Sequence, residues 1–137
     1  MENWNVYQQT VFVLDEKKSG YCFPKNFGIV TAWNPDGVSQ SAAVNAQSDL
    51  DLKRALVSEG FTPIRITGCS PDFKHAEPGW LIEAGKEEVA QWGRRYNQDA
   101  VFWIEMDTIY LVPCEEGSAE TISIGVFSSR LITGRQE

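Results

Sequence analysis

The sequence predicts an α+β protein with a ferredoxin-like split βαβ core, in the order strand, helix, strand, strand, helix, strand (βαββαβ). Three observations predict this fold class. Residues 27–33 and 100–106 are apolar on both faces, which is typical of central strands. Residues 39–58 and 86–96 carry apolar side chains at helical spacing. Turn sequences rich in Gly, Pro, Asn and Asp separate these segments.

The chain has 137 residues, enough for one domain with its own hydrophobic core. We expect a single α+β domain over residues 1–137, with its core at about 27–106 and a C-terminal β-meander at about 107–127. A composition of 42% hydrophobic and 12% aromatic residues favours a folded chain, even with a net charge of −7.

The N-terminal part supplies an added strand and the first central strand. Residues 10–14 (T-V-F-V-L) predict an edge strand, and the polar residues 15–20 predict a loop. The strand at 27–33 stops at Asn34, because N-P-D-G at 34–37 is a turn sequence.

A helix follows, capped by Ser39 or Ser41 and running to about residue 58. Asn45 lies on the apolar stripe of this helix, close to its start, so it points toward the core. A buried amide needs a hydrogen-bond partner. The later strands are expected at 62–67, 80–84, 100–106, 109–112 and 121–127, and the second helix at 86–96. Loops are expected at 68–79, 97–99 and 115–118, and a frayed end at 133–137.

The balance of charges bounds the partners. Nineteen Asp and Glu stand against 12 Lys and Arg, without a local basic patch, so we expect no direct contact with nucleic acid. Three widely spaced cysteines suggest neither a disulfide framework nor a zinc site, and no motif predicts a metal or a cofactor. We expect a cytoplasmic protein, because no signal peptide or membrane-spanning run is visible. The sequence leaves the oligomeric state open.

The predicted topology gathers polar residues at one rim. Right-handed crossover makes the first two core strands parallel, so both end at the same edge of the sheet. The helix starts and the loops that follow these strands lie there too. We therefore expect six side chains from distant segments to meet at this rim: Asn34, Asn45, His75, Glu77, Gln98 and Asp99.

Short motifs in the same region resemble a known family. T-A-W-N-P at 31–35, E-P-G-W at 77–80 and Q-D-A-V-F at 98–102 are similar to an uncharacterised bacterial family of small proteins, classed as a domain of unknown function. The resemblance covers about residues 27–104. It implies no activity, ligand or catalytic residue, but its motifs coincide with the predicted rim.

Each rim residue also has a structural explanation. Asn34 forms an Asx-turn in that reading, Asn45 bonds a nearby backbone group, and Gln98 and Asp99 only end a helix. Glu77 has no local capping role, so its functional and structural readings are balanced. His75 is the only histidine, and with Glu77 two residues away it makes a conceivable acid–base pair.

A second possible contact surface consists of Trp33, Arg65 and Trp103. Strand alternation places these side chains on a sheet face opposite the helices. They are either covered by the N-terminal strand or the meander, or exposed as an aromatic patch that docks a protein.

Three functions remain open from the sequence. The first is a small binding or regulatory protein, such as an inhibitor, which engages a protein partner or a small polar ligand through the rim. The second is a small acid–base enzyme that uses Glu77 and His75 on a polar substrate. The third is an acidic, nucleic-acid-mimicking inhibitor of the kind that phages encode.

Overall fold

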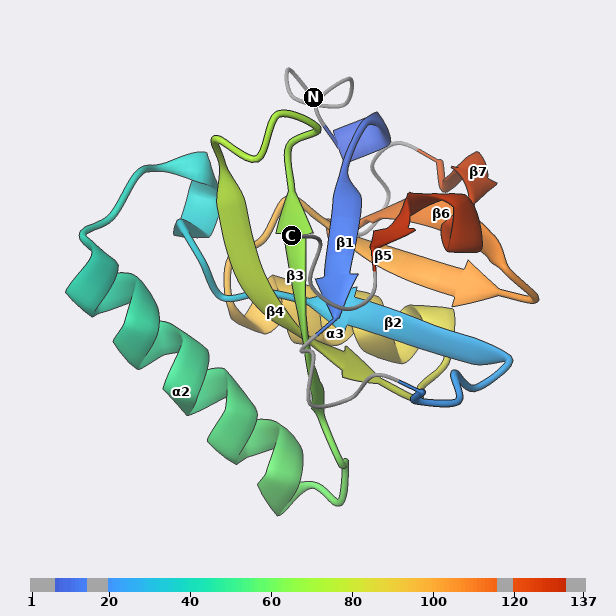
Figure 1. Ribbon diagram of the computed structural model, residues 1–137. Coiled ribbons are helices and arrows are strands. Elements are labelled where there is room, and N and C mark those ends of the chain that lie inside the picture. Colours follow the sequence, from blue (N-terminus) through green and yellow to red (C-terminus); the bar gives the residue numbers. More distant parts are fainter. Residues whose placement is uncertain (1–6, 15–19, 116–119, 133–137) are drawn as a thin grey trace.

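The computed structural model of the protein describes residues 7–14, 20–115 and 120–132 (Figure 1). Nearly all of the predicted loop at 15–20, most of the turn at 115–118 and the predicted frayed end at 133–137 lie outside these ranges. The strands are β1 (Val11–Leu14), β2 (Asn26–Val30), β3 (Ile64–Cys69), β4 (Ala76–Ile82), β5 (Ala100–Glu105), β6 (Thr108–Pro113), β7 (Ile122–Val126) and β8 (Leu131–Ile132). The helices are α2 (Ala42–Ser58) and α3 (Lys86–Arg95), with short 3-10 turns at Pro35–Gly37 and Phe127–Arg130.

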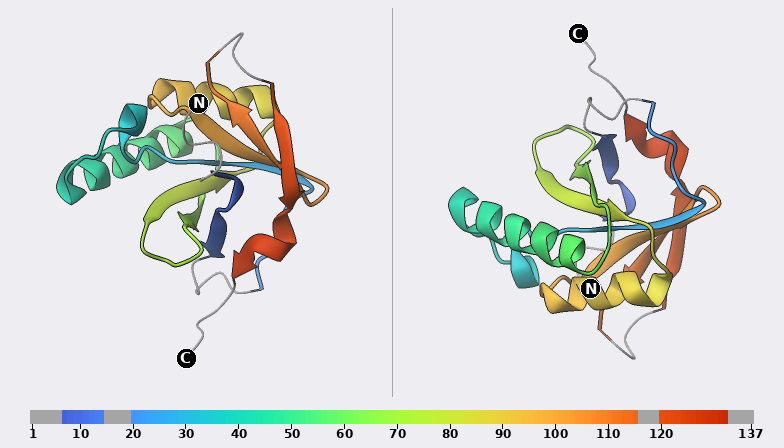
Figure 2. Two further views of the ribbon diagram at one scale, coloured as in Figure 1. Left: turned by 90° about the horizontal axis from the view of Figure 1, so that it is seen from above. Right: turned by 90° about the horizontal axis from the view of Figure 1, so that it is seen from below.

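The fold is α+β, as predicted, and is built on one mixed sheet of eight strands in the order β7-β6-β5-β2-β4-β3-β1-β8. All neighbouring strands are antiparallel except β1 and β8, which are parallel. The sheet curls strongly into a half-barrel, with α2 and α3 outside the curl (Figure 2). The prediction of an edge position for the N-terminal strand is wrong, because β8 pairs with the outer side of β1.

Two hydrophobic clusters fill the two faces of this sheet. The outer cluster lies under the helices and contains Leu52 and Leu56 of α2 and Val89 of α3. The inner cluster lies in the hollow of the curl and contains Phe12 of β1. Alternation along β4 divides its side chains between the two faces, because Trp80 and Ile82 join the outer cluster and Leu81 joins the inner one.

Close packing fixes α3 on the sheet. Gly28 in β2 faces Val89, and a Cβ atom at position 28 would lie 2.4 Å from both methyl groups of that valine. Only glycine therefore lets the helix approach β2 this closely. The start of α2 is fixed by Ser41, whose Oγ accepts a hydrogen bond from the backbone N of Val44 at 3.1 Å. The cap is thus the second of the two predicted serines.

Several strand boundaries differ from the prediction. β3 runs to Cys69 and β4 begins at Ala76, so the predicted loop at 68–79 is wrong at both ends. Pro78 is tolerated inside β4 because the ladder between β2 and β4 ends at Trp80. β2 ends at Val30 instead of residue 33, and just beyond it the Oγ1 of Thr31 accepts from the backbone N of Trp33 and donates to the carbonyl of Pro78.

The two helices of the described ranges are short or mixed in polarity. In the part of the chain that the structure covers, no helix has the length and apolar character needed to span a membrane.

Candidate functional site

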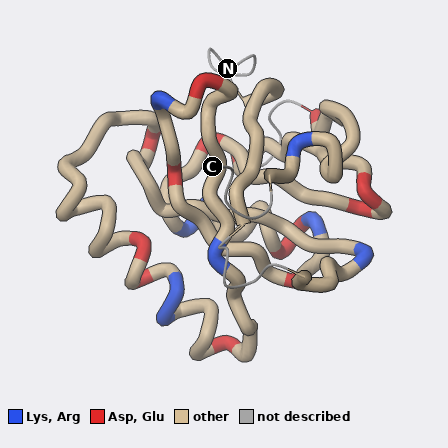
Figure 3. The backbone as a smooth tube through the Cα atoms, in the orientation of Figure 1, with Lys and Arg blue, Asp and Glu red and all other residues tan. Residues whose placement is uncertain are grey.

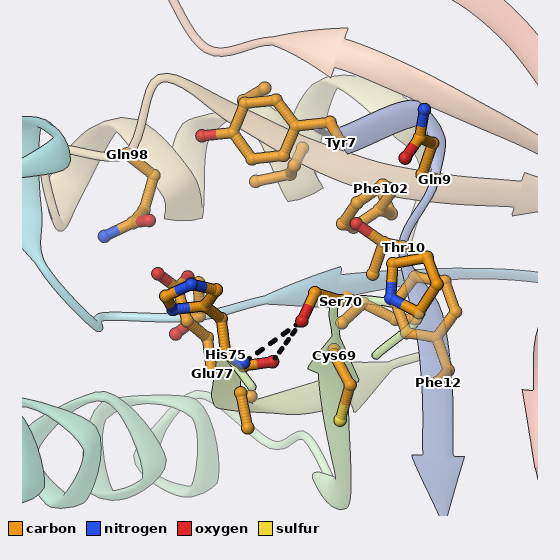
Figure 4. Close-up of a pocket in the computed structure, with 18 of the residues that line it drawn as sticks. Tyr7, Gln9, Thr10, Phe12, Cys69, Ser70, His75, Glu77, Gln98 and Phe102 are labelled. Atoms are coloured by element: carbon orange, nitrogen blue, oxygen red, sulfur yellow. Dashed lines mark hydrogen bonds between the residues drawn. The ribbon is translucent and has the colours of Figure 1, made fainter. Parts of the chain in front are cut away.

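A pocket of about 510 Å³ opens in the hollow of the sheet, near the end of β2 and the loop between β3 and β4 (Figure 4). This volume lies inside the range of about 300–1,000 Å³ that is common for small-molecule sites. Its floor is apolar and is formed by Phe12, Ile29, Ala100 and Phe102. Its other side is polar and includes Tyr7, Ser70, His75, Glu77 and Gln98.

Asn34 and Asn45 form the rigid corner behind this pocket. The Oδ1 of Asn45 accepts from the backbone N of Asn34 at 2.9 Å, and its Nδ2 donates to the Oδ1 of Asn34 at 2.8 Å. The same Asn34 oxygen accepts from the backbone N of Gln40 at 3.0 Å. Asn34 has a left-handed backbone with φ of 47°, a conformation that asparagine tolerates well. Asn45 is 2% exposed, so this pair is an internal brace.

Glu77 lies beside that brace and lines the pocket. The side chain of Asn34 lies close enough to influence this carboxyl, and the Asn34 oxygen already accepts hydrogen bonds from Gln40 and Asn45. Burial raises the pKa of the Glu77 carboxyl, and the nearby Asn34 side chain lowers it by less. The carboxyl therefore lies beside the brace at a cost in desolvation.

Gln98 reaches the same place from the turn after α3. Its Nε2 donates to the carbonyl oxygens of Trp33, at 3.2 Å, and Tyr96, at 3.1 Å. Both amide hydrogens are thus used for bonds to the backbone, and the orientation of the amide follows from them. In Figure 4 the amide oxygen of Gln98 lies on the side that faces Tyr7.

Tyr7 covers the pocket from the N-terminal segment. Its ring packs edge-on against Phe102, with 6.2 Å between the ring centroids. Burial, followed by the negative charges of Asp99 and Glu77, raises the pKa of the Tyr7 hydroxyl to about 12. The phenol is therefore neutral at physiological pH. Asp99 acts on the site through its charge and does not line the pocket wall.

His75 lies at the exposed mouth of the pocket. Its backbone N donates to the Oγ of Ser70 at 3.1 Å, and Ser70 also donates to Asp72 at 2.7 Å. The hydrogen bond from Ser70 lowers the pKa of the Asp72 carboxyl. Within the described residues, no ion pair joins His75 to Glu77. The two members of the predicted acid–base pair share a pocket without contacting each other in this way.

The structure does not place the second predicted surface opposite the helices, and that prediction is wrong. Arg65 turns toward α2, where its guanidinium makes hydrogen bonds of 2.6 and 3.0 Å to the carboxylate of Asp49. The same group stacks on the ring of Trp80 at 3.8 Å. Trp103 packs against the outer cluster and donates its Nε1 to the carbonyl of Ala84 at 3.1 Å. Trp33 is half-buried beside Gln98.

The cysteines and the charged residues offer little further chemistry. Burial raises the pKa of the Cys69 thiol, and it raises that of Cys114 to about 12. Cys22 is exposed. Over residues 7–14, 20–115 and 120–132, no group of three His, Cys, Asp or Glu side chains is close enough to hold a metal ion.

A family model described as a protein of unknown function, DUF3293, matches residues 30–101, which is more than half of the chain. The chain belongs to this family. No curated protein and no solved structure matches the sequence. The DUF3293 segment contains Asn34, Asn45, Glu77, Gln98 and Asp99, together with α2 and α3.

The sequence reasoning missed the wall of the pocket outside the DUF3293 segment. Tyr7 and Phe12 come from the N-terminal segment, and Phe102 lies just beyond the family match. The partner of β1 is β3, more than fifty positions along the chain, and nothing in residues 7–14 signals that pairing. The available signal was the alternation along β5, which places Phe102 on the inner face and Val101 and Trp103 on the outer one.

Proposed function

We propose that the protein binds a small polar molecule in the pocket, with His75, Glu77 and Gln98 of the predicted rim at its polar end. One observation carries the proposal: an aromatic floor and a carboxyl of raised pKa lie in the same cavity. Concave apolar cavities with a few convergent polar groups are the usual form of ligand sites. Perturbed carboxyl groups also concentrate at such sites.

The hydrogen-bond geometry supports binding because the polar end is organised before any ligand arrives. Asn45 holds Asn34 beside Glu77, and two backbone carbonyls hold Gln98. A ligand therefore meets groups whose orientation is already set, which lowers the entropy lost on binding. A regulatory or inhibitory protein also needs a binding site of defined shape, and the Asn34–Asn45 brace would provide one.

The test is a fragment screen by ligand-observed NMR against the wild-type chain and two variants. Ala100→Leu adds bulk to the floor of the pocket, and Gln9→Trp adds bulk at its exposed edge. The control is Val57→Trp on the exposed side of α2, which adds about as much bulk as Gln9→Trp but away from the pocket. We expect fragments that bind the wild type and the control, and that both pocket variants weaken.

A screen in which every bound fragment tolerates both pocket variants would contradict the proposal. Unfolding curves identify a variant that fails to fold, and the other pocket variant then decides the result. The same variants also test a protein partner that inserts one side chain into the pocket. Such a partner would bind the wild type and the control more tightly than the two pocket variants.

An acid–base enzyme is the second candidate, and the raised pKa of Glu77 favours it. A carboxyl that stays protonated at higher pH than usual is a better general acid near neutrality. Tyr7 lies close enough for the charge of Glu77 to raise the pKa of its hydroxyl, and His75 lies at the mouth of the pocket. The test is turnover of amide, ester and nucleotide substrates: Glu77→Gln abolishes turnover and keeps binding if this proposal holds. Unchanged turnover in Glu77→Gln would contradict it.

The nucleic-acid mimic has less support. In Figure 3 the Asp and Glu positions of the described chain are spread over several elements, and Lys and Arg positions lie among them. A mimic needs a continuous acidic stripe that matches the spacing of phosphates. Binding to a heparin-binding or DNA-binding protein that disappears in competition with DNA would support this function.

For the topology, we infer a ferredoxin-like core within the curled sheet. The support is the neighbour order β5-β2-β4-β3, with α2 linking β2 to β3 and α3 linking β4 to β5. A crystal structure with the two helices on opposite faces of the sheet would contradict this description.

A further inference from the structure

The polar end of the pocket has acceptors and negative charge. Among the described residues that line it there is no Lys and no Arg. Glu77 and Asp72 contribute carboxyl groups, and Asp99 adds negative potential from behind. His75 is the one lining side chain that can carry positive charge, and it is exposed at the mouth. An anionic ligand group would therefore meet like charge on entering.

The orientation of Gln98 adds an acceptor to this end. Because its Nε2 donates to the carbonyls of Trp33 and Tyr96, the side chain offers its Oε1 to the pocket. Glu77 adds two carboxyl oxygens, with the Asn34 side chain close by. A ligand group that donates several N–H bonds would match both acceptors.

The state of Glu77 points in the same direction. Glu77 is half-buried, and within the described residues no ion pair supplies it with a cation. Desolvation of its carboxylate is therefore costly, and that cost shows in the raised pKa. A ligand cation placed beside the carboxylate would restore the missing counter-charge. Binding would then remove the proton from Glu77 and relieve the cost of burial.

The rest of the pocket fits a flat apolar body. Phe12 and Phe102 meet edge-on, with ring centroids 5.0 Å apart, and Tyr7 packs edge-on against Phe102 at 6.2 Å. Aromatic rings of this kind accommodate another planar group by stacking or edge contact, and they attract cations by their ring faces.

We propose that the pocket takes a small organic cation with a flat apolar body, whose N–H-bearing group, an amidinium or a protonated amine, pairs with Glu77 and Gln98. This inference rests on the proposed binding function and names the class of its ligand. It separates the site from sites for phosphate or carboxylate ligands, which use Arg, Lys or helix N-termini.

Three isosteric probes test the charge requirement: benzamidine as the cation, benzamide as the neutral form and benzoate as the anion. Binding is followed by NMR of the ¹⁵N-labelled protein, with the side-chain amide of Gln98 as the local reporter. We expect benzamidine to bind most tightly and benzoate not to bind. Benzoate binding as tightly as benzamidine would overturn the proposal.

Two variants connect the effect to the carboxylate. Glu77→Gln keeps the shape and removes the charge, and we expect it to weaken benzamidine binding at least tenfold. The control Asp51→Asn removes an exposed charge on α2, away from the pocket, and we expect less than a twofold change. Equal binding by the wild type and Glu77→Gln would overturn the proposal.

The pH dependence has a defined sign. Because the pKa of Glu77 is raised, benzamidine affinity increases as the pH rises through and above the usual range of a glutamate and the carboxylate forms. The other described titratable groups around the pocket are Tyr7 and Cys69, which stay neutral near neutral pH because burial raises their pKa values, and Asp72, Asp99 and His75. If Glu77 is the source of the pH dependence, the His75→Gln variant retains it. Loss of the pH dependence in His75→Gln would show that repulsion between His75 and the cationic probe is the source, and would overturn the assignment to Glu77.

The outcomes separate the two proposals. Fragments that bind the pocket and are neutral or anionic, with no preference for benzamidine, leave the binding function in place and remove the cation class. A pocket at which neither the probes nor any fragment binds removes both.

Discussion

Asn45 is the residue on which the geometry of the rim depends most. Its amide makes a 2.9 Å bond to the backbone N of Asn34 and a 2.8 Å bond to the Asn34 side chain, from a position that is 2% exposed. Asn45→Ala removes both bonds. A net hydrogen bond is worth about 0.5–1.5 kcal/mol, so we expect a loss of about 2 kcal/mol in the free energy of unfolding.

The assay is urea unfolding followed by tryptophan fluorescence. With a slope of about 2 kcal/mol per molar urea, this loss lowers the unfolding midpoint by about 1 M. Gln47→Ala is the matched control, because it removes an amide from the same helix whose 3.0 Å bond to Asp51 is exposed. We expect the control to change the free energy by less than about 0.5 kcal/mol.

A double-mutant cycle isolates the pair itself. Asn34→Gly is the suitable partner variant, because glycine accepts the left-handed backbone at that position without strain. The two losses are expected to be non-additive by about 1 kcal/mol or more, since each variant removes the same side-chain bond. Additive losses, or an Asn45→Ala variant as stable as the Gln47→Ala control, would refute the brace.

Three further predictions concern the scaffold. Arg65→Met leaves Asp49, whose side chain is 11% exposed, without its ion-pair partner, and we expect the free energy of unfolding to fall by about 2–4 kcal/mol. Arg65→Lys keeps the positive charge and should cost less, and urea unfolding of both variants measures the difference. Gly28→Ala forces a Cβ against Val89 and costs about 1–3 kcal/mol, and the second substitution Val89→Ala recovers part of it; no recovery would show that the helix does not rest on β2. A thiol reagent should modify Cys22 quickly in the native protein, and Cys69 and Cys114 only after unfolding, in a thiol titration. Fast modification of all three thiols would contradict the burial of Cys69 and Cys114.

The sequence predicts the element types well where one physical signal dominates. Helical spacing and capping predict the ends of α2 and α3 to within a residue or two. Ser41 is one of the two predicted caps of α2, because a serine hydroxyl can accept from a backbone N–H at a helix start. The polar rim also follows from chain path, since crossover direction alone brings Asn34, Glu77 and Gln98 to one edge.

Other features depend on pairings that the sequence does not encode locally. Pro78 and Gly79 signal a loop, yet they lie in β4 because the neighbouring ladder stops at Trp80. Arg65 was placed on the wrong face because strand alternation gives two faces without saying which one the helices cover. The pocket itself was invisible, since its floor forms only when the sheet curls and brings Phe12 against Phe102.

The most direct test of the account is the titration of Glu77 in the ligand-free protein. Carboxyl ¹³C NMR measures its pKa, and the resonance that disappears in Glu77→Gln identifies it. The account predicts a midpoint clearly above the usual glutamate value of about 4.3, because the carboxyl is half-buried and the described residues that line the pocket include no Lys or Arg. A midpoint at or below that value would show a solvated or already paired carboxylate and would contradict the proposed site.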